Sequence, residues 1–233
     1  MTKPRYPSHT HRSCQGFTLI ELLSAIAVIA ILAAILIPVI GNLKRKSMVV
    51  QDLNNLRQVG VGIHLYAQEN EQTLPGPLYV TQLTHYQENR FPGHLAGMLA
   101  EYVGALPPDE QMRELEVMVD PAWRQAVADP DDYRSTCYRI VQLKPSAVSS
   151  NWIKNQSIFG YANYSGQDAS KKTPLKLSLV PDTVSLGDIP IITNNNLSEL
   201  GGLPSHVDRR NVLFLDGHTE TFLSDDPEFS LYY

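Results

Sequence analysis

An apolar run at residues 17–40, near the start of the sequence, constrains this chain more than any other feature. A helix needs about 20 predominantly apolar residues to cross the hydrocarbon core of a bilayer, and this run is long enough. Glu21 is the exception, because it places a carboxylate near the start of the run. An ionised side chain costs about 2.5 to 3.5 kcal/mol at mid-bilayer and less near an edge, so it usually serves a function there. We predict a membrane helix in which Glu21 serves a function; the alternative is that Glu21 lies among the lipid headgroups.

The composition beyond this run indicates one acidic globular domain. The sequence has 233 residues and 43% hydrophobic content, which suits a single domain of ordinary size together with a membrane segment. Residues 47–233 contain 13 Lys and Arg against 23 Asp and Glu, a balance of −10. A nucleic-acid-binding surface needs basic residues to neutralise phosphates, so this balance argues against a nucleic-acid partner.

The two cysteines lie on opposite sides of the apolar run, Cys14 before it and Cys137 far beyond it. If the segment before the run is removed, a single thiol remains and no internal disulfide can form. A lone cysteine is most often a small core residue. We therefore predict a structural role for Cys137.

Neither a secretory signal peptide nor a plain anchor accounts well for the amino terminus. The apolar core of a signal peptide has about 7 to 15 residues, and the best small-residue cleavage site, at residues 39–41, leaves Glu21 unexplained. A plain anchor shows a surplus of Lys and Arg on its cytoplasmic side. Here the two flanks carry equal numbers of basic residues: Lys3, Arg5 and Arg12 before the run, and Lys44, Arg45 and Lys46 after it.

Gly16 followed by FTLIEL at residues 17–22 resembles the processing signature of type IV prepilins and type II secretion pseudopilins. In that family a prepilin peptidase cuts after the glycine on the cytoplasmic side and methylates the new amino terminus. The rest of the chain then lies outside the cytoplasm. The resemblance implies cleavage between Gly16 and Phe17, N-methylation of Phe17, and assembly with other pilin-like subunits by a pilus or secretion machinery. Pro38 stands where that family commonly has a proline.

The resemblance also gives Glu21 a partner. Cleavage creates an ammonium on Phe17, and methylation keeps its positive charge. Inside a filament, where water is scarce, that ammonium can pair with Glu21 of a neighbouring subunit, and a subunit out of register would leave both charges unmatched. Gly16 has no side chain, so its backbone can approach a protease closely. Pro38 cannot donate to the carbonyl group of Ala34, which predicts a kink in the helix.

The helix is predicted to continue past the membrane as an amphipathic segment over residues 41–75. Its apolar positions recur at spacings of four and three: Val49, Leu53, Leu56, Val59, Ile63 and Tyr66. Pro75 and Gly76 end the pattern. Gly60 and Gly62 are unfavourable inside a helix, so they indicate either close approach of another backbone or a local break.

Residues 76–233 are predicted to form an extracytoplasmic α+β domain. Helices are expected at residues 93–104 and 109–119, and strands at 136–143, 157–164, 183–189, 211–215 and 218–222. Asp216-Gly217 predicts a two-residue hairpin turn with positive φ at both positions. A sheet packed on the outer half of the helix would bury the apolar face of each. The predicted architecture is therefore α+β and pilin-like: leader 1–16, transmembrane helix 17–40, helical continuation 41–75 and globular domain 76–233.

A second resemblance concerns the carboxyl-terminal part. His206 is followed after nine residues by Asp216-Gly217, and residues 205–222 resemble a motif found in a large group of prepilin-processed proteins. The helical segment at residues 52–75 is similar to the corresponding helix of the same group. The middle of the chain, about residues 77–180, shows no such resemblance.

Four side chains in or beside this motif are candidates for a metal site: His206, Asp208, Asp216 and His218. Pseudopilins of the major class bind calcium through a carboxyl-terminal loop, but calcium takes six to eight oxygens and imidazole suits zinc or other transition metals. Further acids could supply oxygen ligands: Asp182, Asp188, Asp225 and Asp226. The favoured interpretation has no cofactor: Asp216 caps its own turn and His206 bonds a loop backbone.

Catalysis has little support in the sequence, which lacks the G-x-S-x-G, C-x-x-C, H-E-x-x-H and phosphate-loop patterns. His64, His85 and His94 have no nucleophile beside them in a known pattern, so they are predicted to be surface groups. We predict a non-enzymatic filament subunit held in the inner membrane by one helix. The alternative is an extracytoplasmic binding module or enzyme that uses the prepilin leader only for export.

Overall fold

The computed structural model describes residues 17–127, 129, 132, 136–141, 158–162, 173–197, 203–206 and 208–226. The chain divides into two compact units, Met1–Lys44 and Arg45–Tyr233. Helix α1 (Leu19–Glu69) supplies the helical part of the first unit and continues into the second. The predicted leader at residues 1–16, and with it Cys14 and Gly16, lies outside the described residues.

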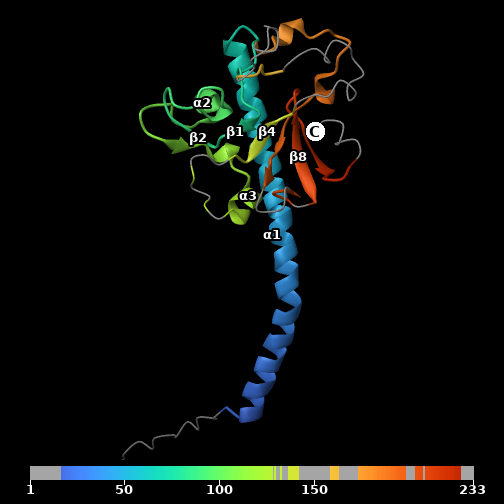
Figure 1. Ribbon diagram of the computed structural model, residues 1–233. Helices are drawn as coiled ribbons and strands as arrows, with labels where there is room; N and C mark the ends of the chain where they lie inside the picture. The colour runs from blue at the N-terminus through green and yellow to red at the C-terminus, as the bar shows by residue number, and fades with distance from the viewer. Residues whose placement is uncertain are drawn as a thin grey trace, which may run out of the picture. The chain divides into compact units, whose positions relative to one another are not determined.

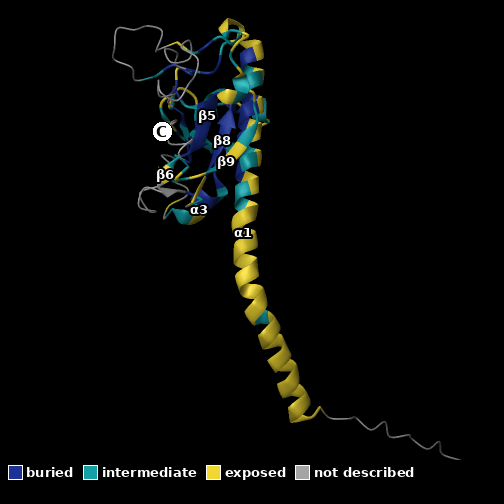
Figure 2. Ribbon diagram, turned by 90° about the vertical axis from the view of Figure 1, so that its right-hand side faces the viewer, coloured by how far each residue is buried: buried dark blue, intermediate teal, exposed yellow. Residues whose placement is uncertain are grey.

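In the first unit, α1 exposes its apolar side chains on all sides (Figure 2), among them Leu19, which is 88% exposed. Among the described residues, α1 is the one helix long and apolar enough to cross a membrane, judged by length and composition. The helix runs through Pro38 without interruption. This segment fits a single membrane anchor, as predicted from the apolar run.

In the second unit, α1 buries one stripe against the rest of the unit (Figures 1 and 2). Leu56, Val59 and Ile63 are at most 1% exposed, which confirms the predicted apolar stripe. Asp52 belongs to the same buried stripe and was not predicted to. The helix ends at Glu69, before the predicted limit at residue 75, because the backbone turns to positive φ just beyond it.

Gly60 and Gly62 mark close approach to α1 and not a break in it. A Cβ added to Gly60 would lie 3.0 Å from Cδ1 of Leu213 and 3.4 Å from Cα of Gly217. A Cβ added to Gly62 would lie 2.9 Å from Cγ1 of Val103. The missing side chain at Gly60 therefore lets the sheet and its hairpin turn pack directly on the helix, and the one at Gly62 makes room for Val103.

A five-stranded antiparallel sheet packs on this part of α1 (Figure 1), which confirms the predicted α+β fold. Its strand order is β1-β4-β5-β8-β9. The strands are β1 (Thr81–Gln82), β4 (Tyr138–Ile140), β5 (Pro190–Asn194), β8 (Arg209–Phe214) and β9 (Thr219–Leu223). Two further pairs are β2 (His85–Tyr86) with β3 (Arg113–Glu114), and β6 (Asn196–Leu197) with β7 (Leu203–Pro204). Leu56 and Ile63 of the helix share one core with Tyr138, Ile192 and Leu213 of the sheet.

The predicted hairpin between β8 and β9 is confirmed, but its turn differs from the prediction. Gly217 has φ +93°, whereas Asp216 is not among the described residues with positive φ. The amide of Gly217 donates to the carbonyl oxygen of Phe214 at 2.9 Å. This arrangement is a type I turn followed by a left-handed glycine, the usual three-residue hairpin loop.

Several local predictions were wrong because long-range pairing outweighed local preference. Residues 109–119 form no α-helix: Arg113 and Glu114 pair with β2, and the 3₁₀ helix η2 (Glu116–Met118) follows. Residues 183–189 contain the 3₁₀ helix η6 (Leu186–Asp188), and the strand begins only at Pro190. Within the predicted strand 157–164, the described residues 158–162 contribute one isolated bridge, Leu78 to Tyr161.

The other predicted elements were close to those observed. The expected helix at 93–104 appears as α2 (Leu95–Leu99) and the 3₁₀ helix η1 (Glu101–Val103). β4 lies within the expected strand at 136–143. The sequence analysis did not predict α3 (Pro121–Ala126), the 3₁₀ helix η5 (Leu177–Leu179) or the short strands β1, β2, β3, β6 and β7. Cys137 is buried in the core, as expected of a structural thiol.

His94 is half-buried, although it was predicted to be a surface group. His64 and His85, for which the prediction was the same, are also half-buried. Its Nδ1 accepts a hydrogen bond from the amide of Leu83 at 3.2 Å, and its ring stacks on Tyr79 with centroids 5.2 Å apart. Burial lowers the pKa of His94 to about 4. The neutral imidazole is therefore the form that fits the folded domain.

We expect that the free energy of unfolding of His94→Asn falls less between pH 7.5 and pH 4 than that of the wild type. In the unfolded chain the imidazole titrates near pH 6.5, whereas in the folded chain its pKa is about 4. The stabilising contribution of neutral His94 is therefore present above pH 6.5 and lost as the pH falls towards 4. Asn offers an acceptor to Leu83 without titrating. Urea unfolding in detergent, followed by circular dichroism from pH 7.5 to 4, measures the difference; parallel curves for the two proteins would contradict the assignment.

Candidate functional site

The predicted processing site lies where α1 begins. Phe17 is 81% exposed, and Thr18 and Glu21 form a reciprocal cap on the first turn. The amide and hydroxyl of Thr18 donate to Oε2 of Glu21 at 2.9 and 2.7 Å, and the amide of Glu21 donates to Oγ1 of Thr18 at 3.3 Å. This is the capping box that the pattern T-x-x-E specifies at a helix start. A glutamate there also suits the positive end of the helix dipole.

The capping box gives Glu21 a partner within its own chain. Oε2 takes both hydrogen bonds from Thr18. A carboxylate has about four lone-pair sites, so these bonds leave room for an ammonium as well. The cap therefore orients the carboxylate at the helix start and does not use up its capacity to accept.

The hairpin half of the carboxyl-terminal motif lies on α1. Gly217 approaches α1 at Gly60, as described above, and Oδ1 of Asp216 accepts from the amide of His218 at 3.0 Å. The carboxylate of Asp216 also lies 2.6 Å from Nδ1 of His218, whose ring stacks on Phe214. Asp216 thus caps its own turn.

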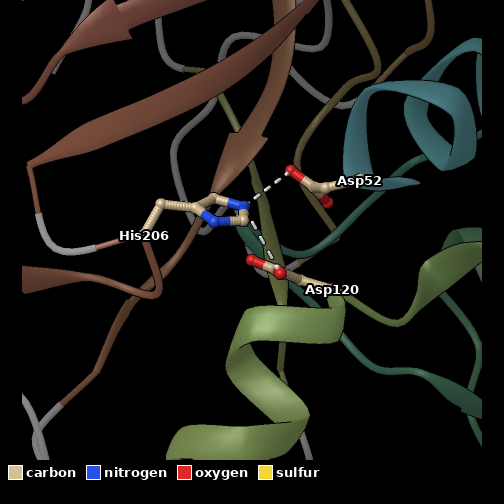
Figure 3. Close-up of side chains that lie close together, drawn as sticks. All are labelled: Asp52, Asp120 and His206. Carbon is tan, nitrogen blue, oxygen red and sulfur yellow. Dashed lines mark hydrogen bonds and ion pairs between the residues drawn. The ribbon is translucent and has the colours of Figure 1, made fainter. Parts of the chain in front are cut away.

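The histidine of the motif reaches the same helix at a different point (Figure 3). Nε2 of His206 lies 3.3 Å from Oδ2 of Asp52 and 3.5 Å from Oδ1 of Asp120. The expectation that His206 bonds a loop backbone was therefore wrong, because its imidazole faces two buried carboxylates. Asp208 is exposed beside Arg209. The structure thus groups His206 with Asp52 and Asp120, and not with Asp208, Asp216 or His218.

The two carboxylates are held by a dense set of donors. Asp52 accepts from the hydroxyl of Tyr138 and from the side-chain amides of Asn194 at 2.9 Å and Asn211 at 2.6 Å. Asp120 caps α3 through the amide of Ala122 at 2.8 Å, and it also accepts from Asn194 at 2.9 Å and from the hydroxyl of Ser205. Through these bonds the cluster of Asp52, Asp120 and His206 joins α1, α3 and the sheet.

Burial and mutual repulsion shift the protonation of this cluster. Burial, and then the charge of Asp52, raise the pKa of Asp120 to about 7. Burial opposes the charged form of His206, but the hydrogen bond to Asp52 and the charge of Asp120 outweigh it and raise its pKa. Burial, followed by the charge of Asp52, also raises the pKa of Tyr138.

Asp52 and Asp120 were missed from the sequence, although each left a signal. Asp52 stands four residues before Leu56 in the buried stripe, so it is a carboxylate on an apolar helix face, as Glu21 is in the membrane run. Asp120 precedes Pro121, the usual order of an N-cap and a first helical residue. Nothing in the local sequence pattern indicates that His206 lies beside both carboxylates.

The other acidic candidates join no such group. Asp182, Asp188 and Asp225 are exposed and Asp226 is half-buried. Among the described residues, Asp52, Asp120 and His206 form the one group of potential metal ligands. In the part of the chain that the structure describes, these four acids therefore belong to no group of potential metal ligands.

Comparison with known families supports the amino-terminal site. Residues 11–37 match the family described as Prokaryotic N-terminal methylation motif, and this range includes Gly16, Phe17 and Glu21. The comparison gives no support for the His-x9-Asp-Gly motif. No curated protein and no solved structure matches the chain. The match supports a prepilin-type precursor with a pilin-like structure.

Proposed function

We propose that this chain is a pilin-like or pseudopilin-like subunit that waits in the inner membrane and is drawn into a type IV pilus or type II secretion pseudopilus. The observation that carries the proposal is the match to the methylation motif at residues 11–37. The match lies at the start of α1, whose apolar side chains in the first unit are exposed. An α+β unit with the second part of α1 in its core fits the same class of protein.

Processing is the first step of the proposed function. A prepilin peptidase cleaves between Gly16 and Phe17 and methylates the new amino terminus. Since the cut falls on the cytoplasmic side, the chain then spans the membrane once, with residues 41–233 outside the cytoplasm. The capping box of Thr18 and Glu21 fixes the start of α1 at Leu19, just after the cut.

Assembly is the second step. The methylated ammonium of Phe17 pairs with Glu21 of a neighbouring subunit while apolar helices pack side by side. Two charges away from water are costly unless they pair, so the pair selects the correct register. The partners of the chain are then the peptidase, other pilin-like subunits and the assembly machinery.

A structural role also agrees with where the strongly shifted groups lie. Asp52 and Asp120 are fully buried and the side chain of His206 is 3% exposed. A general acid or base must come within hydrogen-bond reach of its substrate. These side chains lie inside the domain, which agrees with a structural role for them.

The mass of the mature protein tests the processing step. We expect the protein purified from the membrane to lack residues 1–16 and to carry one methyl group on Phe17. In Gly16→Val the added side chain should keep the backbone from the peptidase, so the leader remains on an otherwise intact membrane protein. A chain that starts at Asn42 would favour a signal peptide instead, and a wild-type chain that keeps its leader would contradict the proposal.

A further inference from the structure

Three side chains that commonly bind metals meet inside the globular unit, although they are far apart in the sequence. Asp52 comes from α1, Asp120 caps α3, and His206 lies between β7 and β8. One ligand atom of each lies within 4.8 Å of the others. We propose that Asp52, Asp120 and His206 bind one divalent transition-metal ion, for which zinc is the best match. The proposal concerns the stability of the domain and does not depend on filament assembly.

The direction of the imidazole is the first argument. A single ring nitrogen, Nε2 of His206, faces both carboxylates, at 3.3 and 3.5 Å (Figure 3). This nitrogen carries at most one hydrogen, and a charge-assisted N–H···O bond is about 2.7 to 2.9 Å long. Two ligands bound to one tetrahedral zinc ion at about 2.0 to 2.1 Å lie roughly 3.3 to 3.4 Å apart. The separations thus suit ligands around a shared ion better than two hydrogen bonds.

The charge of the cluster is the second argument. Within the described residues, His206 is the one ion-pair partner of either carboxylate. If both carboxylates are ionised, a single protonated imidazole balances only one of the two charges. A divalent cation beside a neutral imidazole compensates both carboxylates.

The amides around the carboxylates supply the third argument. Nδ2 of Asn194 donates to Asp52 and to Asp120, at 2.9 Å in both cases, and so bridges the two ligands. Nδ2 of Asn211 donates to Asp52 at 2.6 Å. Ligand carboxylates in metalloproteins are usually oriented by such hydrogen bonds. These bonds hold both carboxylates facing His206. On Asp52 both amides donate to Oδ2, the oxygen that faces the imidazole, so a bound ion would displace or share one of these bonds.

The ligand chemistry selects the kind of ion. Calcium takes six to eight oxygens, which two carboxylates and an imidazole do not provide. Zinc accepts carboxylate oxygen and imidazole nitrogen together and commonly takes four ligands. Water or the hydroxyl of Ser205, which already contacts Asp120, would supply the fourth. Such an ion would join α1, α3 and the segment before β8.

Zinc binding by the full-length protein in detergent micelles tests the proposal. After treatment with EDTA and dialysis, titration calorimetry with zinc chloride should show one ion per chain. Zinc should also raise the midpoint of thermal unfolding measured by circular dichroism, because it binds the folded state. Calcium chloride should do neither. A folded wild-type protein that takes up no zinc, or that responds equally to calcium, would overturn the proposal.

Two matched substitutions locate the site. His206→Gln removes the nitrogen ligand and should weaken zinc binding by at least about tenfold. His218→Gln removes a half-buried imidazole that lies 2.6 Å from Asp216, the alternative place for an adventitious ion, and should leave binding unchanged. The opposite result, with binding lost only in His218→Gln, would refute the assignment.

Cobalt keeps the proposal testable if His206→Gln fails to fold. Cobalt chloride added to the metal-free wild-type protein should give the intense visible absorption of a four-coordinate ion, and zinc should displace it. Weak absorption typical of six oxygen ligands would count against a site that contains His206.

Discussion

Replacing Glu21 by Ala is expected to abolish filaments, although the chain still enters the membrane and is still cleaved. The carboxylate caps its own helix start through Thr18, and in the proposed filament it also meets the ammonium of Phe17 on a neighbour. Removing one member of a buried ion pair costs about 3 to 5 kcal/mol per contact, or roughly a hundred- to a few thousand-fold in each association constant. Sheared filament fractions and electron microscopy measure assembly, and the mass of the mature chain measures cleavage.

Two companion variants separate charge from capping. Glu21→Gln keeps an oxygen that can accept from Thr18 but removes the charge, so it should also fail to assemble. Ser24→Ala removes a hydroxyl that donates only to the carbonyl oxygen of Glu21, at 2.9 Å, and should assemble as the wild type does. Normal filaments from Glu21→Gln would show that capping, and not charge pairing, is what Glu21 provides.

The helix was predictable from the sequence because its signals are local. The long apolar run and the spacing of Leu56, Val59 and Ile63 both repeat within a few residues, and the structure has a continuous helix over them. The hairpin was predictable for the same reason, since Asp216-Gly217 stands between its strands. Only the turn type differed, because a three-residue loop needs positive φ at the glycine alone.

The middle of the sheet was less predictable because its pairing joins distant segments. β5 pairs with β4 on one side and β8 on the other. The alternation of apolar residues placed this strand at residues 183–189, whereas it begins at Pro190. Arg113 and Glu114 lie in a segment of helical pattern, yet they pair with β2. Tertiary pairing here outweighs a helical preference of at most about 0.7 kcal/mol per residue.

The candidate sites differ in the same way: one lies within a short segment of the sequence, and the other is formed by distant segments. Gly16, Phe17 and Glu21 lie within one short segment of the sequence, so a local pattern is enough to predict them together, and the family match at residues 11–37 includes all three. Asp52, Asp120 and His206 are brought together only by the packing of α1, α3 and the sheet. The principle that found Glu21, a carboxylate on an apolar helix face, applies equally to Asp52. It would have identified one member of the cluster, but not its partners.

Truncation of the buried face of α1 is expected to destabilise the globular unit more than any surface change. Leu56→Ala and Ile63→Ala each remove a side chain that is at most 1% exposed in the core shared with the sheet. Such substitutions cost about 2 to 5 kcal/mol each, from lost burial and the cavity left behind. Urea unfolding of the full-length protein in detergent, followed by the circular dichroism of the domain, measures the loss.

Val61→Ala is the matched control, because Val61 lies on the same stretch of α1 but is 58% exposed. Its effect on the free energy of unfolding should stay within about 0.5 kcal/mol. If all three variants unfold at the same urea concentration as the wild type, this stretch of α1 does not contribute to the core. A difference between the two faces would instead show that the helix that carries the membrane segment also stabilises the globular unit. Export of the domain and anchoring of the subunit would then depend on one continuous element.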